Sequence, residues 1–418
     1  MPTTAIEAGT AFANIVDPDV YLNGFPHATF KRLRDEDPVS WWDEEEGSGF
    51  WAVTRYDDVL SVSQNRIFSS SRGIRLEEMK EDELKARRTM MEMDPPEHTN
   101  YRRIVQPPFL NKEVAAVEDS IRQLARAVVD NVDGRPDIDF VEDVARQLPM
   151  RMLGKLLGIP DADGPWLVKQ GDALIGNTDP EFTSHPVDKV DTDAYRLMPF
   201  RSPASRQLFE YALRAAKERH EHPTGDLISR LLQPKRDGDF LKDDEFQNFF
   251  TLLVAAGNDT TRYTKAAGML ALIEHPEQLA ELRDHPELLP SATEEILRWG
   301  TVTMHFRRTA MANTELAGKS IKAGSKVLLW FISGDYDERQ FPDPFRFDIK
   351  RSPNEHMAFG LKSPHKCIGE HLARVEIRVL LAELLPRLAS VKVNGPIERL
   401  RSNFISGIKH LPLKLTWV

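Results

Sequence analysis

Cysteine is nearly absent from this sequence, since Cys367 is the only one among 418 residues. A single thiol excludes a disulfide framework and any zinc or iron–sulfur cluster held by several thiolates. The 12 histidines are scattered along the chain, and none forms the HExxH pair of a metalloprotease helix. A metal centre built from several protein ligands is therefore not expected.

Long apolar runs and an excess of basic residues are also missing. The longest apolar run near the middle, residues 249–257, is about half of the ~20 residues that a membrane helix needs. Residues 1–19 are acidic and lack the basic and apolar regions of a secretory signal. With 55 basic and 65 acidic residues, a nucleic-acid binder is not expected either. We expect a cytoplasmic protein without a membrane anchor.

The composition that is present suits a large folded core. Apolar residues make up 41% of the chain and charged residues 29%, which excludes a disordered chain. Aromatic and β-branched runs at 38–42 and 50–53, separated by an acidic turn, predict a β-hairpin. Strand signals recur at 315–316, 326–331 and 411–415, whereas helical periodicity predicts helices over 111–132, 139–157, 202–220, 243–274, 276–285, 290–299 and 370–388. Long helices with small sheets predict a mainly α, α+β fold.

The predicted helix 243–274 has polar residues in its middle. Its first half is apolar on nearly every face, and then Gly257, Asp259 and Thr260 follow. One interpretation is a widened point, where Gly257 makes room for a ligand and the Asp259–Thr260 pair handles protons. The alternative is a helix that reaches solvent at its centre, with the threonine bonded back to a carbonyl.

Two further motifs are a pair of opposite charges on a helix and the segment around the only cysteine. Glu295 and Arg298 lie one turn apart on a helix, which by itself predicts an ordinary surface ion pair. A second arginine, Arg346, lies in the Pro- and aromatic-rich segment 341–348, so a buried glutamate held by two arginines is the alternative. Cys367 lies where an irregular loop enters a helix, a setting that favours a thiolate. It could be a nucleophile, a buried apolar thiol or the ligand of a haem iron.

Taken in order, these motifs resemble those of the cytochrome P450 superfamily, and the resemblance covers nearly the whole chain. Three segments carry it: Ala256-Gly257-Asn258-Asp259-Thr260, Glu295-Ile296-Leu297-Arg298, and the cysteine loop from Phe359-Gly360 to His365-Lys366-Cys367-Ile368-Gly369. The loop is one residue longer than the commonest form, with residues 361–364 where a glycine is usual. The resemblance implies a single P450 domain over 1–418, with haem between the long central helix and the helix after the cysteine loop.

The resemblance also implies roles for individual residues. Cys367 would be the axial thiolate of haem b, with Phe359 beside its sulfur and Gly257 near the haem. Propionate partners would be His98, Arg102, Arg308 and His365. Asp259 would relay protons, and Thr260 would hydrogen-bond the oxygen being activated. Glu295, Arg298 and Arg346 would form a structural ion triad, and the substrate pocket would include Ala256, Val302, Thr303, Phe404 and Ile405.

The implied reaction is hydroxylation of a hydrophobic small molecule by O2. Similarity to bacterial members favours a sterol, branched lipid, alkane or terpenoid as the substrate. No flavin or iron–sulfur motif is present, so the electrons would come from a separate ferredoxin with its reductase. The alternatives are a haem-thiolate sensor or ligand carrier without turnover, a peroxide-driven member, and a haem-free helical interaction protein.

Overall fold

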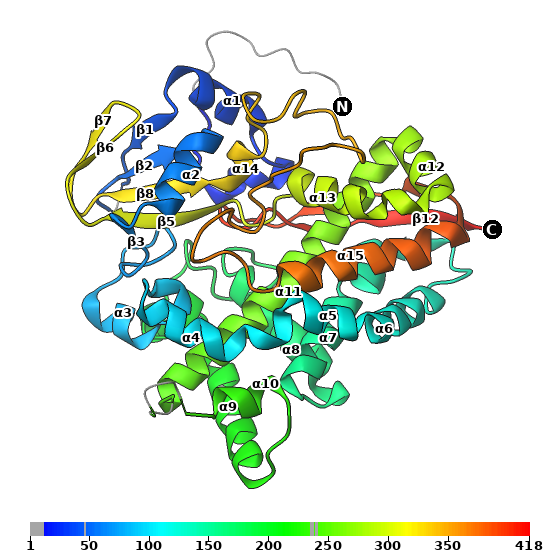
Figure 1. Ribbon diagram of the computed structural model, residues 1–418, viewed down its shortest axis with the longest axis horizontal. Coiled ribbons are helices and arrows are strands. Elements are labelled where there is room, and N and C mark those ends of the chain that lie inside the picture. Colours follow the sequence, from blue (N-terminus) through cyan, green and yellow to red (C-terminus); the bar gives the residue numbers. More distant parts are fainter. Residues whose placement is uncertain (1–11, 46, 235–237, 239–240) are drawn as a thin grey trace.

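The computed structural model describes residues 12–45, 47–234, 238 and 241–418. Long helices fill the lower and right parts of Figure 1 and the largest sheet lies at the upper left, which confirms the predicted mainly α, α+β class. The helices are α1 (His27–Glu36), α2 (Tyr56–Gln64), α3 (Glu81–Ala86), α4 (Glu97–Val105), α5 (Asn111–Ala116), α6 (Glu118–Asp130), α7 (Gln147–Leu157), α8 (Gly164–Ile175), α9 (Pro203–Glu221), α10 (Leu227–Leu231), α11 (Asp243–Glu274), α12 (Pro276–Asp284), α13 (Leu289–Trp299), α14 (Phe331–Gly334) and α15 (Glu370–Leu384).

The strands form four small sheets. The largest has the order β1-β2-β8-β5-β3, and the others are β4-β12-β9, β6-β7 and β10-β11. Their bounds are β1 (Val39–Trp42), β2 (Phe50–Val53), β3 (Phe68–Ser69), β4 (Asp137–Asp139), β5 (His305–Ala310), β6 (Thr314–Leu316), β7 (Lys319–Ile321), β8 (Lys326–Trp330), β9 (Leu388–Val393), β10 (Glu398–Arg399), β11 (Ile408–His410) and β12 (Pro412–Trp417). The predicted hairpin is confirmed, since β1 pairs antiparallel with β2.

Helix α11 runs through the helical part of the molecule, with α15 in front of it in Figure 1. It packs against α7, α8, α9 and α13, and its bounds are those predicted from its periodicity. Gly268 lets α13 approach closely, because a Cβ there would lie 2.5 Å from Cγ2 of Ile296. Among the described helices, none combines the length and the apolar composition needed to cross a lipid bilayer.

Several element boundaries differ from the prediction. The segment 111–132 is broken at Val117 into α5 and α6. The segment 139–157 begins as strand β4 and a π-helical turn, because Asp139 pairs with Pro412 of β12. Helix α15 ends at Leu384, where Pro386 follows without an N–H to continue the hydrogen-bond ladder. The periodicity missed α8, which contains Gly164, Pro165 and Gly171.

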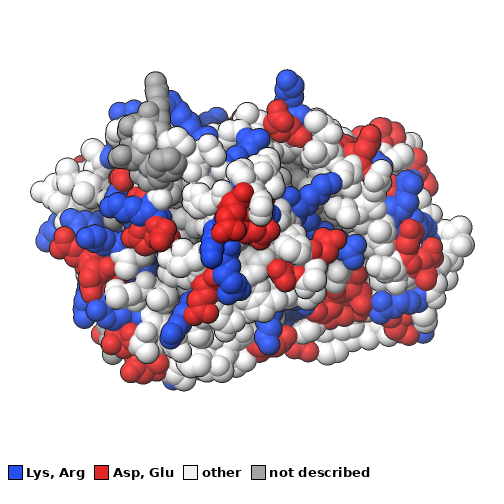
Figure 2. Space-filling model, turned by 90° about the horizontal axis from the view of Figure 1, so that it is seen from below, with Lys and Arg blue, Asp and Glu red and all other residues white. Residues whose placement is uncertain are grey.

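Charges of both signs are scattered over the face shown in Figure 2. On the face shown in Figure 2, lysine and arginine side chains lie interspersed with aspartate and glutamate. This mixture accords with the balance of 55 basic and 65 acidic residues.

Candidate active site

The cysteine loop leads directly into α15. The N–H of Cys367 donates to the backbone oxygen of Phe359 at 2.9 Å, which folds the loop back on itself. Gly360 and Lys362 both have left-handed backbones, with φ of 70° and 50°. A lysine thus adopts, in the longer loop, the conformation that glycine accommodates with less strain. Residues 361–364 therefore turn without their usual glycine.

The Cys367 side chain is exposed, yet the surrounding protein raises the pKa of its thiol by desolvation. A hydrogen bond from the Gly369 N–H and the charges of Arg102 and Arg374 act in the opposite direction, but burial has the larger effect on the pKa. The expected preference for a thiolate at this helix start is therefore not met by the protein groups alone. A bound metal ion would reverse it.

Four basic side chains meet beside this loop. His98 and Arg102 come from α4, Arg308 from β5 and His365 from the loop itself. The ring centroids of His98 and His365 are 4.3 Å apart. Arg102 donates from Nη1 to the backbone oxygen of Pro364 at 3.2 Å. The structure thus brings together the four side chains that the resemblance assigns to the propionates.

Arg102 and Arg308 carry the positive charge of this group of four residues, the cation cluster, since both of its histidines are neutral at pH 7. Burial, together with adjacent positive charges, lowers the pKa of His98 to about 4 and that of His365 to about 2. Burial also lowers the pKa of Arg308 to about 10, opposed by Asp94. In the described part of the chain, Nε2 of His98 and Nδ1 of His365 are buried without a hydrogen-bond partner. The cluster fits a ligand that brings carboxylates.

Asp259 is fully buried in α11 rather than exposed at its centre. Its Oδ1 accepts from Asn258 at 2.8 Å and pairs with Arg262 at 3.0 Å, while its Oδ2 is buried without a described partner. Arg262 also donates to Asp172 of α8 at 2.7 Å. Burial raises the pKa of Asp259 to about 7, although the charge of Arg262 lowers it. This carboxyl can exchange a proton near neutral pH.

Thr260 faces a different direction from Asp259. Its half-buried hydroxyl donates to the backbone oxygen of Ala256 at 3.0 Å, as the second interpretation of this stretch expects. Ala256 itself is exposed, so this side of α11 is accessible. Neighbouring helix residues do not share a face, and within the described residues the side chains of Asp259 and Thr260 bond to different partners.

Gly257 lies against α7. A Cβ at this position would lie 3.1 Å from Cδ1 of Leu153 on α7. The missing side chain therefore makes room for the packing of α7 against α11. The expected position of Gly257 near a haem stays a prediction.

The residues expected in the substrate pocket come together from two segments. Thr303 forms a backbone bridge with Ile405, and the N–H of Met304 donates to the oxygen of Phe404 at 3.0 Å. Val302 and Ile405 are buried in the apolar cluster that also contains residues 253–255 of α11. These residues form one apolar wall.

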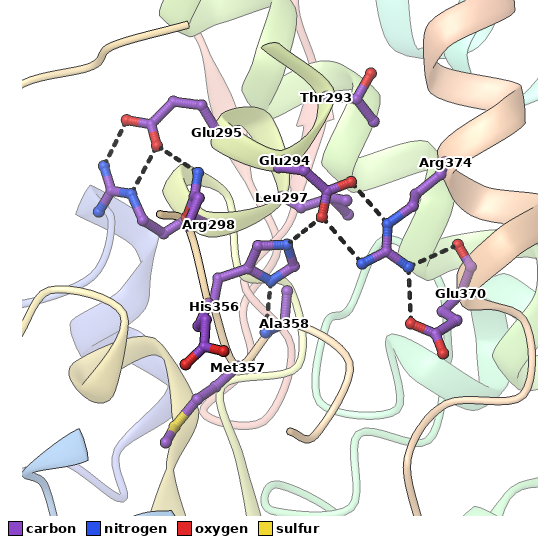
Figure 3. Close-up of polar contacts among 12 residues, drawn as sticks. Thr293, Glu294, Glu295, Leu297, Arg298, His356, Met357, Ala358, Glu370 and Arg374 are labelled. Carbon is purple, nitrogen blue, oxygen red and sulfur yellow. Dashed lines mark hydrogen bonds and ion pairs between the residues drawn. The ribbon is translucent and has the colours of Figure 1, made fainter. Parts of the chain in front are cut away.

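The ion triad is present with one member changed. Glu295 and Arg298 are both fully buried, and Arg298 donates from Nη2 and Nε to the two carboxylate oxygens at 2.8 Å (Figure 3). The second arginine is Arg351, whose Nε lies 3.1 Å from Oε2 of Glu295. The prediction of Arg346 is wrong: its side chain is exposed, and its backbone oxygen accepts from Arg351.

A second charged network, which the motifs did not reveal, links α13 to α15. Glu294 accepts from His356 at 3.1 Å and from Arg374 at 2.7 Å, and Arg374 also pairs with Glu370 at 2.7 Å (Figure 3). Burial raises the pKa of Glu294, but these bonds outweigh it and bring the pKa to about 2. The Arg374 guanidinium lies 4.7 Å from the ring centroid of Phe359, so this network supports the cysteine loop.

Comparison with known proteins places this arrangement in a family. The Cytochrome P450 family model matches residues 201–409. The chain is 34% identical to a steroid C26-monooxygenase of Mycobacterium tuberculosis, over 96% of this chain and 92% of the relative. It is 36% identical to a methyl-branched lipid omega-hydroxylase of Mycobacterium bovis, over 100% and 96%.

A solved structure agrees with these relatives. The Mycobacterium marinum cytochrome P450 in complex with pseudoionone superposes with a TM-score of 0.87 at 36% identity, covering 97% of this chain and 100% of that one. The chain belongs to the cytochrome P450 family. It is a P450 monooxygenase, an oxidoreductase, as the resemblance implied.

Family membership implies a haem-thiolate iron cofactor, and the residues present fit one. The only cysteine of the chain is exposed beside this cluster, whose two arginines can bind carboxylates and whose two histidines each have a buried ring nitrogen without a described partner.

Proposed function

We propose that this P450 hydroxylates a hydrophobic small molecule of the sterol, branched-lipid, alkane or terpenoid class. Its single domain, residues 1–418, would use haem b, O2 and electrons from a separate ferredoxin with its reductase, in the cytoplasm. The relatives named above act on steroids and methyl-branched lipids, which supports the apolar part of this proposal. The apolar wall of Val302, Phe404 and Ile405 supports it independently.

The observation that carries the proposal is that Cys367 lies beside the cation cluster. Cys367 would bind the haem iron, and Arg102, Arg308, His98 and His365 would neutralise and hydrogen-bond the propionates. Arginine suits this role because its planar fork meets a carboxylate with two bonds. Phe359 would hold the loop beside the sulfur through its bond from the Cys367 N–H. Haem bound in this way supplies the activation of O2 for transfer of one oxygen atom to the substrate.

The residues of α11 would manage the protons of this reaction. Hydroxylation uses one O2, two electrons and two protons, and it releases one water. Asp259 can take up and release a proton at Oδ2, which no described group occupies. The Thr260 hydroxyl donates a hydrogen bond to the backbone oxygen of Ala256. Its own oxygen can therefore still accept a hydrogen bond on the accessible side of the helix. General acid catalysis of this kind contributes about 10²–10⁴-fold.

The absorption spectrum of the reduced, CO-bound protein tests the axial ligand. We expect the native chain to show the haem-thiolate band and Cys367→Ser to lose it. Persistence of the thiolate band in Cys367→Ser would assign the iron ligand elsewhere. Product formation with a surrogate ferredoxin and reductase, compared with peroxide alone, tests the electron source. Equal turnover with peroxide alone would contradict the proposal that a ferredoxin supplies the electrons.

A further inference from the structure

Arg75 places a cation against the apolar wall. It lies in the loop between β3 and α3, and its guanidinium carbon stands 3.9 Å from the ring centroid of Phe200 and 5.3 Å from that of Phe404. Phe404 belongs to the proposed substrate pocket, and Phe200 comes from the segment between α8 and α9. Both rings pack against the apolar cluster that contains Val302 and Ile405. Arg75 therefore lies where the apolar wall meets the connection between β3 and α3 and that between α8 and α9.

The backbone around Arg75 is fixed from β5. The N–H of Arg307 donates to the oxygen of Ile74 at 2.8 Å, and Nη1 of Arg307 donates to the oxygen of Glu77 at 2.8 Å and to that of Arg75 at 3.4 Å. On the other side, Asn177 holds the Phe200 oxygen at 3.0 Å. The guanidinium is thus presented by anchored segments, which is what a binding group requires.

No described carboxylate pairs with the Arg75 guanidinium. The nearest acidic neighbours are engaged elsewhere: Glu77 accepts from Arg87 at 3.0 and 3.2 Å, and Glu92 accepts from Thr89 at 2.7 Å. Arg75 is half-buried, and burial lowers its pKa to about 10, although the charges of Glu77 and Glu92 oppose this. A phenyl face compensates such a charge less well than a carboxylate does.

A neutral histidine adjoins this position. His305 is 3% exposed, its ring centroid lies 5.6 Å from that of Phe404, and its Nδ1 has no described partner. Burial is the main cause that lowers the pKa of His305 to about 3; a hydrogen bond with the Asn403 backbone opposes it, and the charge of Arg75 adds to it. His305 therefore adds no positive charge at pH 7, and Arg75 is the cation at this end of the apolar wall. An apolar wall that ends in such a guanidinium matches an apolar molecule with one anionic end.

We propose that Arg75 binds a carboxylate of the substrate, so that the substrate is an apolar carboxylic acid. The carboxylate would bind the guanidinium through charge-assisted hydrogen bonds and would not itself react. This inference rests on the proposed function and narrows it from hydrophobic molecules in general to those with an acidic end. It makes Arg75 a residue that determines specificity.

The test compares acids with their neutral esters. The probes are citronellic acid, hexadecanoic acid and cholanic acid, each with its methyl ester, titrated calorimetrically into the haem-loaded enzyme at pH 8. We expect at least one acid to bind about 10- to 100-fold more tightly than its ester, as expected for hydrogen bonds to a charged group. Arg75→Gln should reduce this ratio to about 2-fold or less while leaving the affinity for the ester nearly unchanged, and Arg75→Lys should keep part of it.

The control is Arg66→Gln, which removes an exposed arginine from the loop after α2 and should leave the ratio unchanged. The proposal is wrong if no acid binds more tightly than its ester to the native enzyme. It is also wrong if Arg75→Gln weakens acid and ester equally, because the guanidinium would then only support the wall. The reduced, CO-bound spectrum of each variant separates these outcomes from failure of the proposed function, since the thiolate band must persist in all of them.

Discussion

At the scale of single residues, Asp259 has the most altered acidity among the groups assigned to the reaction. Its pKa of about 7 exceeds the ordinary value of 3.8, chiefly because of burial. The folded chain therefore keeps this proton after the unfolded chain has lost it. Stability contributed by this carboxyl falls as the pH rises from about 4 to about 7.

The same pKa predicts a pH dependence of turnover. If protonated Asp259 supplies protons, product formation should fall as the pH rises through about 7. Asp259→Asn should lower turnover by about 100-fold and remove this fall, because an amide does not titrate. Turnover measured from pH 6 to 9 with saturating electron donor checks both. If turnover of Asp259→Asn still falls as the pH rises through about 7, another group is responsible for that fall.

Thr260 gives a second prediction at this scale. Thr260→Ala removes the hydroxyl on the accessible side of α11 without leaving a buried donor unpaired, since that hydroxyl bonds only to Ala256. We expect haem content and substrate binding to remain, while a larger share of the reducing equivalents ends as peroxide. The measurement is product and peroxide formed per NADH consumed.

The matched control for this variant is Thr264→Ala, one turn further along. Thr264 makes the same kind of bond, to the oxygen of Thr260 at 2.9 Å, but is buried. Its loss should leave the coupling of electrons to product unchanged. Tight coupling in Thr260→Ala would exclude the role proposed for this hydroxyl.

At the scale of elements, the triad of Glu295, Arg298 and Arg351 links the irregular segment after α14 to α13. Arg351 contacts Glu295 and also donates to the backbone oxygens of Pro342, Asp343 and Arg346. Arg351→Met would leave Glu295 with one buried arginine less and free three carbonyls. We expect a loss of about 3–5 kcal/mol in the free energy of unfolding. Urea denaturation of the haem-loaded protein measures it.

Arg346→Met is the counterpart of that experiment. The side chain of Arg346 is exposed and makes no described ion pair, so its loss should change stability by about 0.5 kcal/mol or less. Equal destabilisation by the two substitutions would indicate that Arg346, the arginine first expected from the sequence, also contributes to holding Glu295.

The comparison of these two arginines shows where sequence reasoning ends. The bounds of α11 follow from a periodicity that extends over 32 residues, and the structure confirms them. Arg346 and Arg351 lie in a segment without periodicity, where the path of the backbone decides which one reaches Glu295. Likewise, the sequence marks Gly257 as unusual but does not say which neighbour its missing side chain faces. That neighbour, Leu153, belongs to another helix.

At the scale of the whole molecule, the family could be predicted because its motifs occur in order along the chain. Residues 256–260, 295–298 and 359–369 are each weak signals, but their sequence of appearance is specific, and the family model and relatives confirm it. Surfaces behave differently. Whether a charge is free to meet a partner depends on its neighbours in space, which the sequence does not give.

The basic residues that we propose as the docking surface for a ferredoxin illustrate this dependence. They come from the cysteine loop, α4 and α5: Arg102, Arg103, Lys112, Lys362 and Lys366. Three of them are engaged, Lys366 with Glu370 at 2.6 Å, Lys362 with Glu355 at 3.8 Å and Arg102 with the Pro364 oxygen. Arg103 and Lys112 are exposed and have no described ion-pair partner. These two charges are therefore the ones most available to an acidic protein.

We expect reduction by an acidic ferredoxin to slow as the ionic strength rises, because salt screens exposed charges beyond about 10 Å at 0.1 M. Arg103→Glu and Lys112→Glu should each lower the second-order rate several-fold at low salt and flatten its salt dependence. Lys217→Glu, which reverses an exposed lysine of α9 that is not part of the proposed surface, is the control and should change neither. Stopped-flow reduction with a surrogate ferredoxin measures the rate. If the rate of reduction of the native enzyme does not depend on salt, the ferredoxin docks elsewhere. If all three charge reversals lower the rate equally, the net charge of the protein is the cause and not this surface.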